Sequence, residues 1–189
     1  MTTTADPATI VAVDDDDGAT DLYRTWLASS YTVRTANGGR EALDVVDETT
    51  DVVLLDRQMP DLTGDTVLRT LRDRRYECRV VMLTGVEPDV DIVTLPFDDY
   101  LVKPVEYETL REVVDRQLQR VHYDELLDEY FTLARKKALL EARYDERVLR
   151  IERPYRRLET DLEALRPRAD AVRDELLASD TPLVLGGTR

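Results

Sequence analysis

The stretch TIVAVDDDDG, residues 9–18, joins a run of apolar and β-branched residues to four consecutive aspartates, Asp14 to Asp17. The apolar run is typical of a buried strand. Four like charges at the end of such a strand repel one another and weaken a fold. Two interpretations are open at this point. Either the aspartates are solvated loop charges in an acidic protein, or some of them hold a cation.

The first 119 residues alternate between strand-like and helix-like patterns. Short runs rich in β-branched residues predict buried strands at residues 9–13, 31–35, 51–55, 79–83 and 100–102. Segments with apolar residues at helical spacing lie between most of these runs and after the last one. The alternation predicts an α/β fold with a doubly wound, five-stranded parallel sheet and helices on both faces. In such sheets the functional site lies beyond the carboxyl ends of the strands.

Polar residues with a common chemical meaning stand at these strand ends. Asp14 and Asp15 follow the first run, Asp56 the third, Thr84 the fourth and Lys103 the fifth. Carboxylates gathered around one point cannot all stay ionised without a cation, and Mg²⁺ suits a site with few protein carboxylates. A lysine and a hydroxyl beside such an ion suit a phosphoryl group, for which a carboxylate is a nucleophile. The predicted chemistry is phosphoryl transfer onto an aspartate.

Four motifs carry a resemblance to a known family. They are VDDD (13–16), LLDRQMPDLTG (54–64), MLT (82–84) and DYLVKP (99–104). In this order and at about this spacing, they make the chain from about Thr9 to Leu118 resemble the receiver domain of two-component response regulators, the CheY-like family with a flavodoxin-like fold. The resemblance implies a phosphorylation-dependent switch rather than a turnover enzyme. It also implies a histidine kinase as the partner that supplies the phosphoryl group.

The resemblance assigns the acceptor and the metal ligands. Asp56 would be the phospho-acceptor. Mg²⁺ would be held mainly by Asp15, with help from Asp14, Asp56 and the backbone carbonyl of Gln58. The two remaining aspartates, residues 16–17, are interpreted as the acidic start of a helix, where the helix dipole favours negative charge.

The resemblance also assigns the residues that respond to phosphorylation. Thr84 would bond the phosphoryl oxygens, Lys103 would pair with the phosphate, and Tyr100 would be the aromatic residue that reports the state. Pro104 would follow a cis peptide bond. Residues 85–102 depart from the family because they are short and contain two prolines. We expect one short turn or an irregular loop there instead of a full helix.

Composition limits the classes of function. The chain has 189 residues and 42% hydrophobic residues, which is enough for a core, and its single cysteine, Cys78, excludes an internal disulfide. No apolar run reaches membrane-spanning length and no signal peptide is evident, so we expect a cytoplasmic protein with no membrane contact. Arginine in place of lysine, together with a net charge of −14, resembles the proteins of halophilic archaea.

Charge is unevenly distributed along the chain. Residues 1–119 hold 12 basic and 25 acidic side chains, whereas residues 120–189 hold 14 and 15. The first part would repel DNA phosphates, but the second part is not excluded from binding DNA. Within it, five arginines recur at helical spacing: Arg143, Arg147, Arg150, Arg153 and Arg157. They could contact nucleic acid, or they could form a solvated face with salt bridges to neighbouring acids.

The C-terminal third reads as helix from about Glu106. Apolar residues follow one another in alternating steps of three and four, which predicts a coiled-coil seam. The seam is Val148, Ile151, Tyr155, Leu158, Leu162, Leu165, Ala169, Val172 and Leu176. Because proline is tolerated only at the start of a helix, we expect a first helix ending near Arg150 and a second starting near Pro154, folded back as an antiparallel hairpin. One long kinked helix is the alternative. Pro167 should kink the second helix in either case.

The segment EYFTLARKKALLEARYDERV, residues 129–148, makes this region resemble the HalX domain of halophilic archaea. The predicted organisation is a flexible N-terminus (1–8), a receiver domain (9–119), a HalX-like hairpin (120–180) and a flexible tail (181–189). The expected function is a response regulator whose helical output module regulates transcription. The helices would pair with a second copy or with another helical protein, and DNA binding stays open. The alternative is a signalling scaffold that acts only through protein contacts.

Overall fold

The computed structural model describes residues 7–85 and 93–179, and the chain divides into two compact units. The first unit holds the described residues up to Leu118, and the second holds those from Gln119 onward. Among the described residues, no helix combines the length and the apolarity that a membrane-spanning segment needs.

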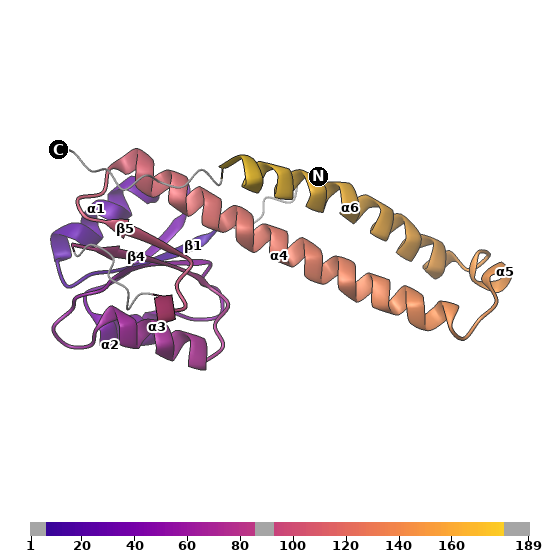
Figure 1. Ribbon diagram of the computed structural model, residues 1–189, viewed down its shortest axis with the longest axis horizontal. Helices are drawn as coiled ribbons and strands as arrows, with labels where there is room; N and C mark the ends of the chain where they lie inside the picture. The colour runs from indigo at the N-terminus through magenta and orange to yellow at the C-terminus, as the bar shows by residue number, and fades with distance from the viewer. Residues whose placement is uncertain (1–6, 86–92, 180–189) are drawn as a thin grey trace. The chain divides into compact units, whose positions relative to one another are not determined.

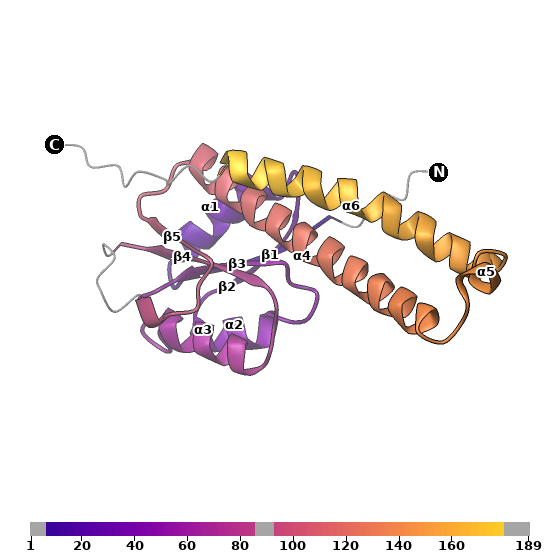
Figure 2. The ribbon, with the colours of Figure 1, turned by 45° about the vertical axis from the view of Figure 1, so that its right-hand side comes forward.

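A five-stranded sheet forms the centre of the first unit (Figures 1 and 2). Its strands are β1 (Thr9–Val13), β2 (Thr32–Ala36), β3 (Val52–Asp56), β4 (Arg79–Thr84) and β5 (Asp99–Val102). They lie in the order β2-β1-β3-β4-β5, and every neighbouring pair is parallel. The predicted fold class is therefore confirmed, and each predicted strand differs from the observed one by no more than one residue at either end.

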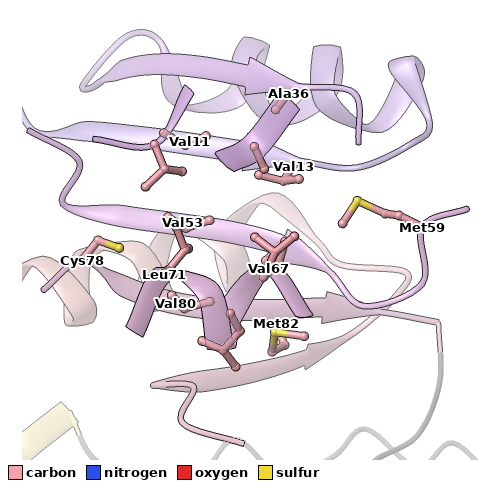
Figure 3. Packing of buried hydrophobic residues seen from close by; sticks show 14 of the residues in the cluster. Val11, Val13, Ala36, Val53, Met59, Val67, Leu71, Cys78, Val80 and Met82 are labelled. Atoms are coloured by element: carbon pink, nitrogen blue, oxygen red, sulfur yellow. The ribbon is translucent and has the colours of Figure 1, made fainter. Parts of the chain in front are cut away.

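Helices cover both faces of this sheet. They are α1 (Asp17–Leu27), α2 (Gly39–Val45), α3 (Gly64–Asp73) and the first part of α4 (Tyr107–Glu141). Side chains of a strand alternate between the two faces, and in β1 this alternation divides the core. Val11 packs in the cluster that contains Val67 and Leu71 of α3 (Figure 3), whereas Ile10 packs with Leu110 of α4 on the opposite face. The three central strands β1, β3 and β4 are buried on both faces, which explains why they are almost continuously apolar.

Aspartate side chains begin two of these helices. The Asp16 carboxylate accepts a hydrogen bond from the Gly18 N–H at 2.8 Å and caps α1, whose first residue is Asp17. The prediction that these two aspartates begin a helix is therefore confirmed. At α2 the cap comes from a distant loop, because the Asp61 carboxylate accepts the N–H groups of Gly39 and Arg40, each at 3.0 Å.

The segment between β4 and β5 is described only in part. Residues 86–92 lie outside the described residues, and a short 3₁₀ turn follows at residues 93–94. The expectation of one short turn or an irregular loop therefore falls partly outside the described chain. The entry into β5 is held by Asp98, whose carboxylate pairs with Arg72 at 2.8 Å and Arg79 at 2.6 Å.

The second unit is an antiparallel helical hairpin. After α4 come a short α5 (Glu146–Leu149) and a long α6 (Arg153–Ser179), and α4 and α6 lie side by side in both views (Figures 1 and 2). The hairpin is confirmed, and the alternative of one long kinked helix is wrong. The predicted end of the first helix near Arg150 is also wrong, because α4 ends at Glu141. Asp145 caps a new helix by accepting the Arg147 N–H at 2.8 Å, which competes with continuing the old one.

The predicted seam holds only within α6. Tyr155 and Leu165 are buried, and the other seam residues of α6 are half-buried: Leu158, Leu162, Ala169, Val172 and Leu176. Val148 and Ile151 precede α6 and are exposed, whereas Leu149 of α5 is buried in their place. α6 continues through Pro167, and the kink expected there stays a prediction.

Gly64 is a position in the first unit at which the surrounding backbone leaves no room for a side chain. A Cβ on this residue would collide with the backbone oxygen of Asp56 and lie 2.9 Å from the Cα of Arg57. We expect Gly64→Ala to lower the free energy of unfolding by about 1–3 kcal/mol, the usual cost of overpacking. Gly85→Ala is the matched control, because a Cβ there meets nothing within 4 Å. Chemical denaturation of both variants checks this, and equal effects would contradict it.

Candidate functional site

The functional site lies at the topological switch point of the sheet, where the order of the strands reverses. From β1 the chain adds β2 on one side of the sheet and then β3 on the other, so the carboxyl ends of β1 and β3 border a crevice. Asp14 immediately follows β1, and Asp56 is the last residue of β3. Thr84 ends β4, and Lys103 immediately follows β5. The topology thus brings the predicted residues to one edge of the sheet.

Three carboxylates and one ammonium group meet at this edge. The Lys103 Nζ donates to Asp14 Oδ2 at 2.6 Å and to Asp56 Oδ1 at 2.8 Å. Asp14, Asp15 and Asp56 each offer a carboxylate oxygen, and these oxygens lie within 4.8 Å of one another. The Asp14 and Asp56 side chains are only 3% and 7% exposed, whereas Asp15 is exposed. The structure therefore places four of the predicted site residues in one cluster.

Backbone groups hold the two central side chains in place. The Gln58 N–H donates to Asp56 Oδ2 at 2.8 Å, so this carboxylate is bonded on both oxygens. The N–H of Lys103 donates to the Thr84 carbonyl at 2.8 Å, which ties the start of the Lys103 loop to the end of β4. The peptide bond between Lys103 and Pro104 is cis. The role predicted for the Gln58 carbonyl as a metal ligand stays a prediction.

The two predicted switch residues lie on neighbouring strands. Thr84 is fully buried at the end of β4 and pairs in register with Val102. Tyr100 lies on β5, where its ring packs on Phe97 with centroids 5.7 Å apart and borders the core cluster. The roles of both residues in signalling stay predictions.

Burial and pairing act against each other on the charged groups. Burial raises the pKa of Asp56, and the hydrogen bond from Lys103 offsets only part of this effect. Burial by itself would lower the pKa of Lys103, but its bonds to Asp14 and Asp56 outweigh burial and raise that pKa. Lys103 is therefore held in the charged form, and one ammonium faces three carboxylates. The excess of negative charge and the hard oxygen donors fit a divalent cation of the Mg²⁺ type.

Comparison with known proteins agrees with this geometry. The model of the response regulator receiver domain matches residues 10–115, which is more than half of the chain. The chain belongs to the response regulator receiver family. The HalX domain model matches residues 119–184, so this response regulator carries a helical C-terminal domain of the HalX type.

Similar proteins support the same conclusion. A candidate transcriptional regulator of Haloferax volcanii is 46% identical over 86% of this chain and 28% of its own length. The transcriptional regulatory protein CpxR of Escherichia coli is 36% identical over 61% of this chain and 51% of its own length. The solved response regulator TrrA of Thermotoga maritima, in complex with Mg²⁺ and BeF, is 27% identical over 58% of this chain and 98% of its own, with a TM-score of 0.51. The chain thus spans about a quarter to a half of the curated relatives.

Two residues that support the receiver site, Asp61 and Gly64, received no individual role in the sequence analysis. Asp61 caps α2, and the two backbone N–H groups that it binds lower the pKa of its carboxyl group. Gly64 allows the start of α3 to approach the end of β3. A signal was present in PDLTG, since aspartate and glycine at a turn suggest a cap and a close backbone approach. The partner of each residue could not be read from the sequence.

The five arginines of the C-terminal domain are all exposed but do not share one helix. Arg143 lies between α4 and α5, Arg147 lies in α5, and Arg150 follows α5. The other two, Arg153 and Arg157, lie in the first turns of α6. Arg150 pairs with Glu146 through its Nε at 3.0 Å, and Arg157 approaches Asp161 at 4.0 Å. Contact of these arginines with nucleic acid stays a prediction.

Asp56 should make stability depend on pH in a defined direction. Its folded-state pKa lies above its unfolded value, so folding disfavours the ionised form. That penalty is absent at low pH and grows as the pH rises through the folded pKa. We expect Asp56→Asn to melt at a higher temperature than the wild type at neutral pH and the difference to vanish below about pH 4, near the unfolded pKa. Calorimetry from neutral pH to below about pH 4 measures the melting temperatures of the wild type and of Asp56→Asn.

Asp61→Asn is the control with the opposite sign. The N–H groups of Arg40 and Gly39 lower the pKa of Asp61, so its contribution to stability is present at neutral pH and is lost as the pH falls. We expect this variant to melt below the wild type at neutral pH. A less stable Asp56→Asn protein at neutral pH would show that pairing, not burial, dominates at Asp56.

Proposed function

We propose that this response regulator accepts a phosphoryl group on Asp56 from a histidine kinase. Mg²⁺ would be held by Asp14, Asp15, Asp56 and the backbone carbonyl of Gln58. The observation that carries the proposal is the position of Asp56, a buried carboxylate between the Lys103 ammonium and the Gln58 amide, with two further carboxylates beside it. The TrrA structure, which contains Mg²⁺ and BeF, is consistent with such a site.

The cluster supports an in-line displacement. A carboxylate oxygen of Asp56 would attack phosphorus while the bond from phosphorus to the kinase histidine nitrogen breaks, which leaves an aspartyl phosphate. The nucleophile must be ionised, and Lys103 opposes the rise in pKa that burial causes at Asp56. The bound Mg²⁺ would supply positive charge to the phosphoryl oxygens. The result is a switch with slow self-catalysed dephosphorylation rather than a turnover enzyme.

Lys103 connects the added charge to the sheet. A phosphoryl group adds about −1.5 to −2 charges and offers strong acceptors to an ammonium that now bonds Asp14 and Asp56. The backbone N–H of Lys103 is hydrogen-bonded to the Thr84 carbonyl. A shift in the position of Lys103 would therefore move the ends of β4 and β5. Thr84 would bond the phosphoryl oxygens, and Tyr100 would report the change through its packing on Phe97.

The output would run through the HalX domain. α4 begins at Tyr107 and continues past Leu118 to Glu141, so a single helix has residues in both units. Phe131 and Leu139 of this helix are 57% and 68% exposed, which supports contact with a second copy or another helical protein. The name of the Haloferax volcanii relative supports control of transcription as the final effect.

Phosphorylation can be tested with the full chain, Mg²⁺ and acetyl phosphate. We expect intact-mass spectrometry to show one added phosphoryl group on the wild type. Asp56→Ala removes the nucleophile and should show none, and Asp15→Ala should react far more slowly because a metal ligand is lost. Asp17→Ala is the matched control, since Asp17 is an exposed acid in the first turn of α1. Modification of Asp56→Ala at the wild-type level would refute the acceptor assignment.

Assembly can be tested by light scattering in high salt, with and without beryllofluoride and Mg²⁺. We expect the mass of the wild type to change when the analogue binds and the mass of Asp56→Ala to stay constant. Phe131→Glu should bind the analogue but show no change in mass, because it charges an exposed apolar side chain of α4. If the wild type binds the analogue without a change in mass, the proposal of self-association is wrong, although phosphorylation of Asp56 is not.

A further inference from the structure

The tip of the hairpin, where α4 ends and α5 and α6 lie close together, contains an apolar groove. It encloses about 320 Å³ and is lined by residues of all three helices and their connections, among them Leu140, Tyr144, Val148, Leu149, Pro154 and Tyr155. Ligand pockets usually measure about 300–1,000 Å³, so this groove has room for one or two side chains.

The groove has a buried floor and an exposed apolar rim. Leu149 and Tyr155 are only 5% and 3% exposed and form its base. Tyr144 and Val148, which also line the groove, are 49% and 48% exposed. When a partner covers these apolar side chains, their removal from water stabilises the complex by about 25 cal/mol per Å² of buried apolar surface.

The base of the groove is held rigidly. The Tyr155 hydroxyl donates to the Glu141 carboxylate at 2.8 Å, and burial together with this bond raises the pKa of Tyr155 to about 12. Close by, Lys137 of α4 pairs with Glu159 of α6 at 3.1 Å. Because these bonds cross between the two long helices, the groove is formed before any partner arrives, which lowers the entropic cost of binding.

The segment that forms the groove carries a local excess of positive charge in an otherwise acidic chain. Residues 135–157 contain nine lysines and arginines and four acidic residues, a balance of +5. Glu159 and Asp161, which pair with Lys137 and Arg157 of this segment, reduce the balance to +3 over residues 135–161, whereas the whole chain carries −14. Glu152 is the one acidic residue in the lining. A partner that fits this surface must bring negative charge around its apolar group. Two copies of the tip would repel each other because both carry positive charge.

An acidic protein fits these features better than a nucleic acid. Phosphates bind arginines without needing an apolar groove, and unpaired bases stack on aromatic rings. Four of the seven lining residues are aliphatic (Leu140, Val148, Leu149 and Pro154), and Tyr144 is the one exposed aromatic ring among the seven, because Tyr155 is buried. An apolar anchor in a pocket, surrounded by charged contacts that exclude water, is the usual arrangement of a protein–protein hot spot.

We propose that the hairpin tip docks an acidic segment of a partner protein, which inserts a large apolar side chain into the groove. The arginines around the groove pair with carboxylates on both sides of the anchor. This contact requires no phosphoryl group, so its test is independent of the proposal for Asp56.

The probe is a dye-labelled pool of short acidic peptides with leucine, isoleucine or phenylalanine at two central positions. Fluorescence anisotropy with the full chain measures binding. We expect Val148→Glu to weaken binding at least about tenfold, because it places a carboxylate in the rim of the groove. Peptides with serine at both central positions should lose binding to the wild-type protein by the same factor. Arg143→Glu with Arg147→Glu should weaken binding by a similar factor.

Matched controls lie elsewhere on α6. Leu177→Glu changes an apolar side chain that is 68% exposed, and Arg166→Glu with Arg168→Glu makes the same charge change away from the groove. Both should bind the peptides like the wild type, and circular dichroism should show equal helicity in all variants. Equal loss in the controls would mean that charge alone attracts the probe, which overturns the proposal.

Other occupants have their own readouts. A short DNA duplex is run in parallel, and the chain alone is examined by sedimentation at the same concentrations. Salt-sensitive DNA binding that disappears with the arginine pair but survives Val148→Glu would overturn the proposal in favour of nucleic acid. Self-association that Val148→Glu abolishes would assign the groove to a second copy. Absence of binding by the whole peptide pool would also refute it.

Discussion

The shared hydrogen bonds of Lys103 are the interaction on which the receiver site depends. Two buried carboxylates, Asp14 and Asp56, stand at the ends of adjacent strands, and without a cation their mutual repulsion and lost hydration would destabilise the fold. The lysine that bonds both comes from beyond β5, two strands away from β3. The site therefore exists only when the whole sheet is assembled. The same ammonium is placed to respond when the charge on Asp56 changes.

Backbone constraints keep these side chains close together. Gly64 lets α3 start directly against the end of β3, and Gln58 donates its N–H to the acceptor carboxylate. The hydrogen bond from the Lys103 N–H to the Thr84 carbonyl fixes the backbone at the point where β5 ends. Local packing and the chemistry of the site are thus parts of one arrangement, and a methyl group at Gly64 should disturb both.

Aspartates have different physical roles in this acidic chain. Asp16 and Asp61 accept N–H groups at helix starts, and those bonds lower the pKa of Asp61. Asp56 is buried, and its pKa is raised. Asp98 pairs with two arginines and anchors the fifth strand. The number of acidic residues therefore says little about a site, whereas their burial and partners decide their chemistry.

The sequence by itself determined the parallel sheet, its strand ends and the cluster of Asp14, Asp15, Asp56 and Lys103. These features depend on local patterns: apolar runs mark the strands, and parallel strands place their carboxyl ends at one edge. It also indicated the hairpin, because the seam in α6 and Pro154 are local signals. Only the tertiary structure decided that α4 ends at Glu141, that Asp61 caps α2, and that an apolar groove lies at the hairpin tip. The end of α4 depends on competition between a new helix cap and continuation of the helix, and the other two features depend on contacts between distant segments. The periodicity of apolar residues within one segment contains no information about such competition or such contacts.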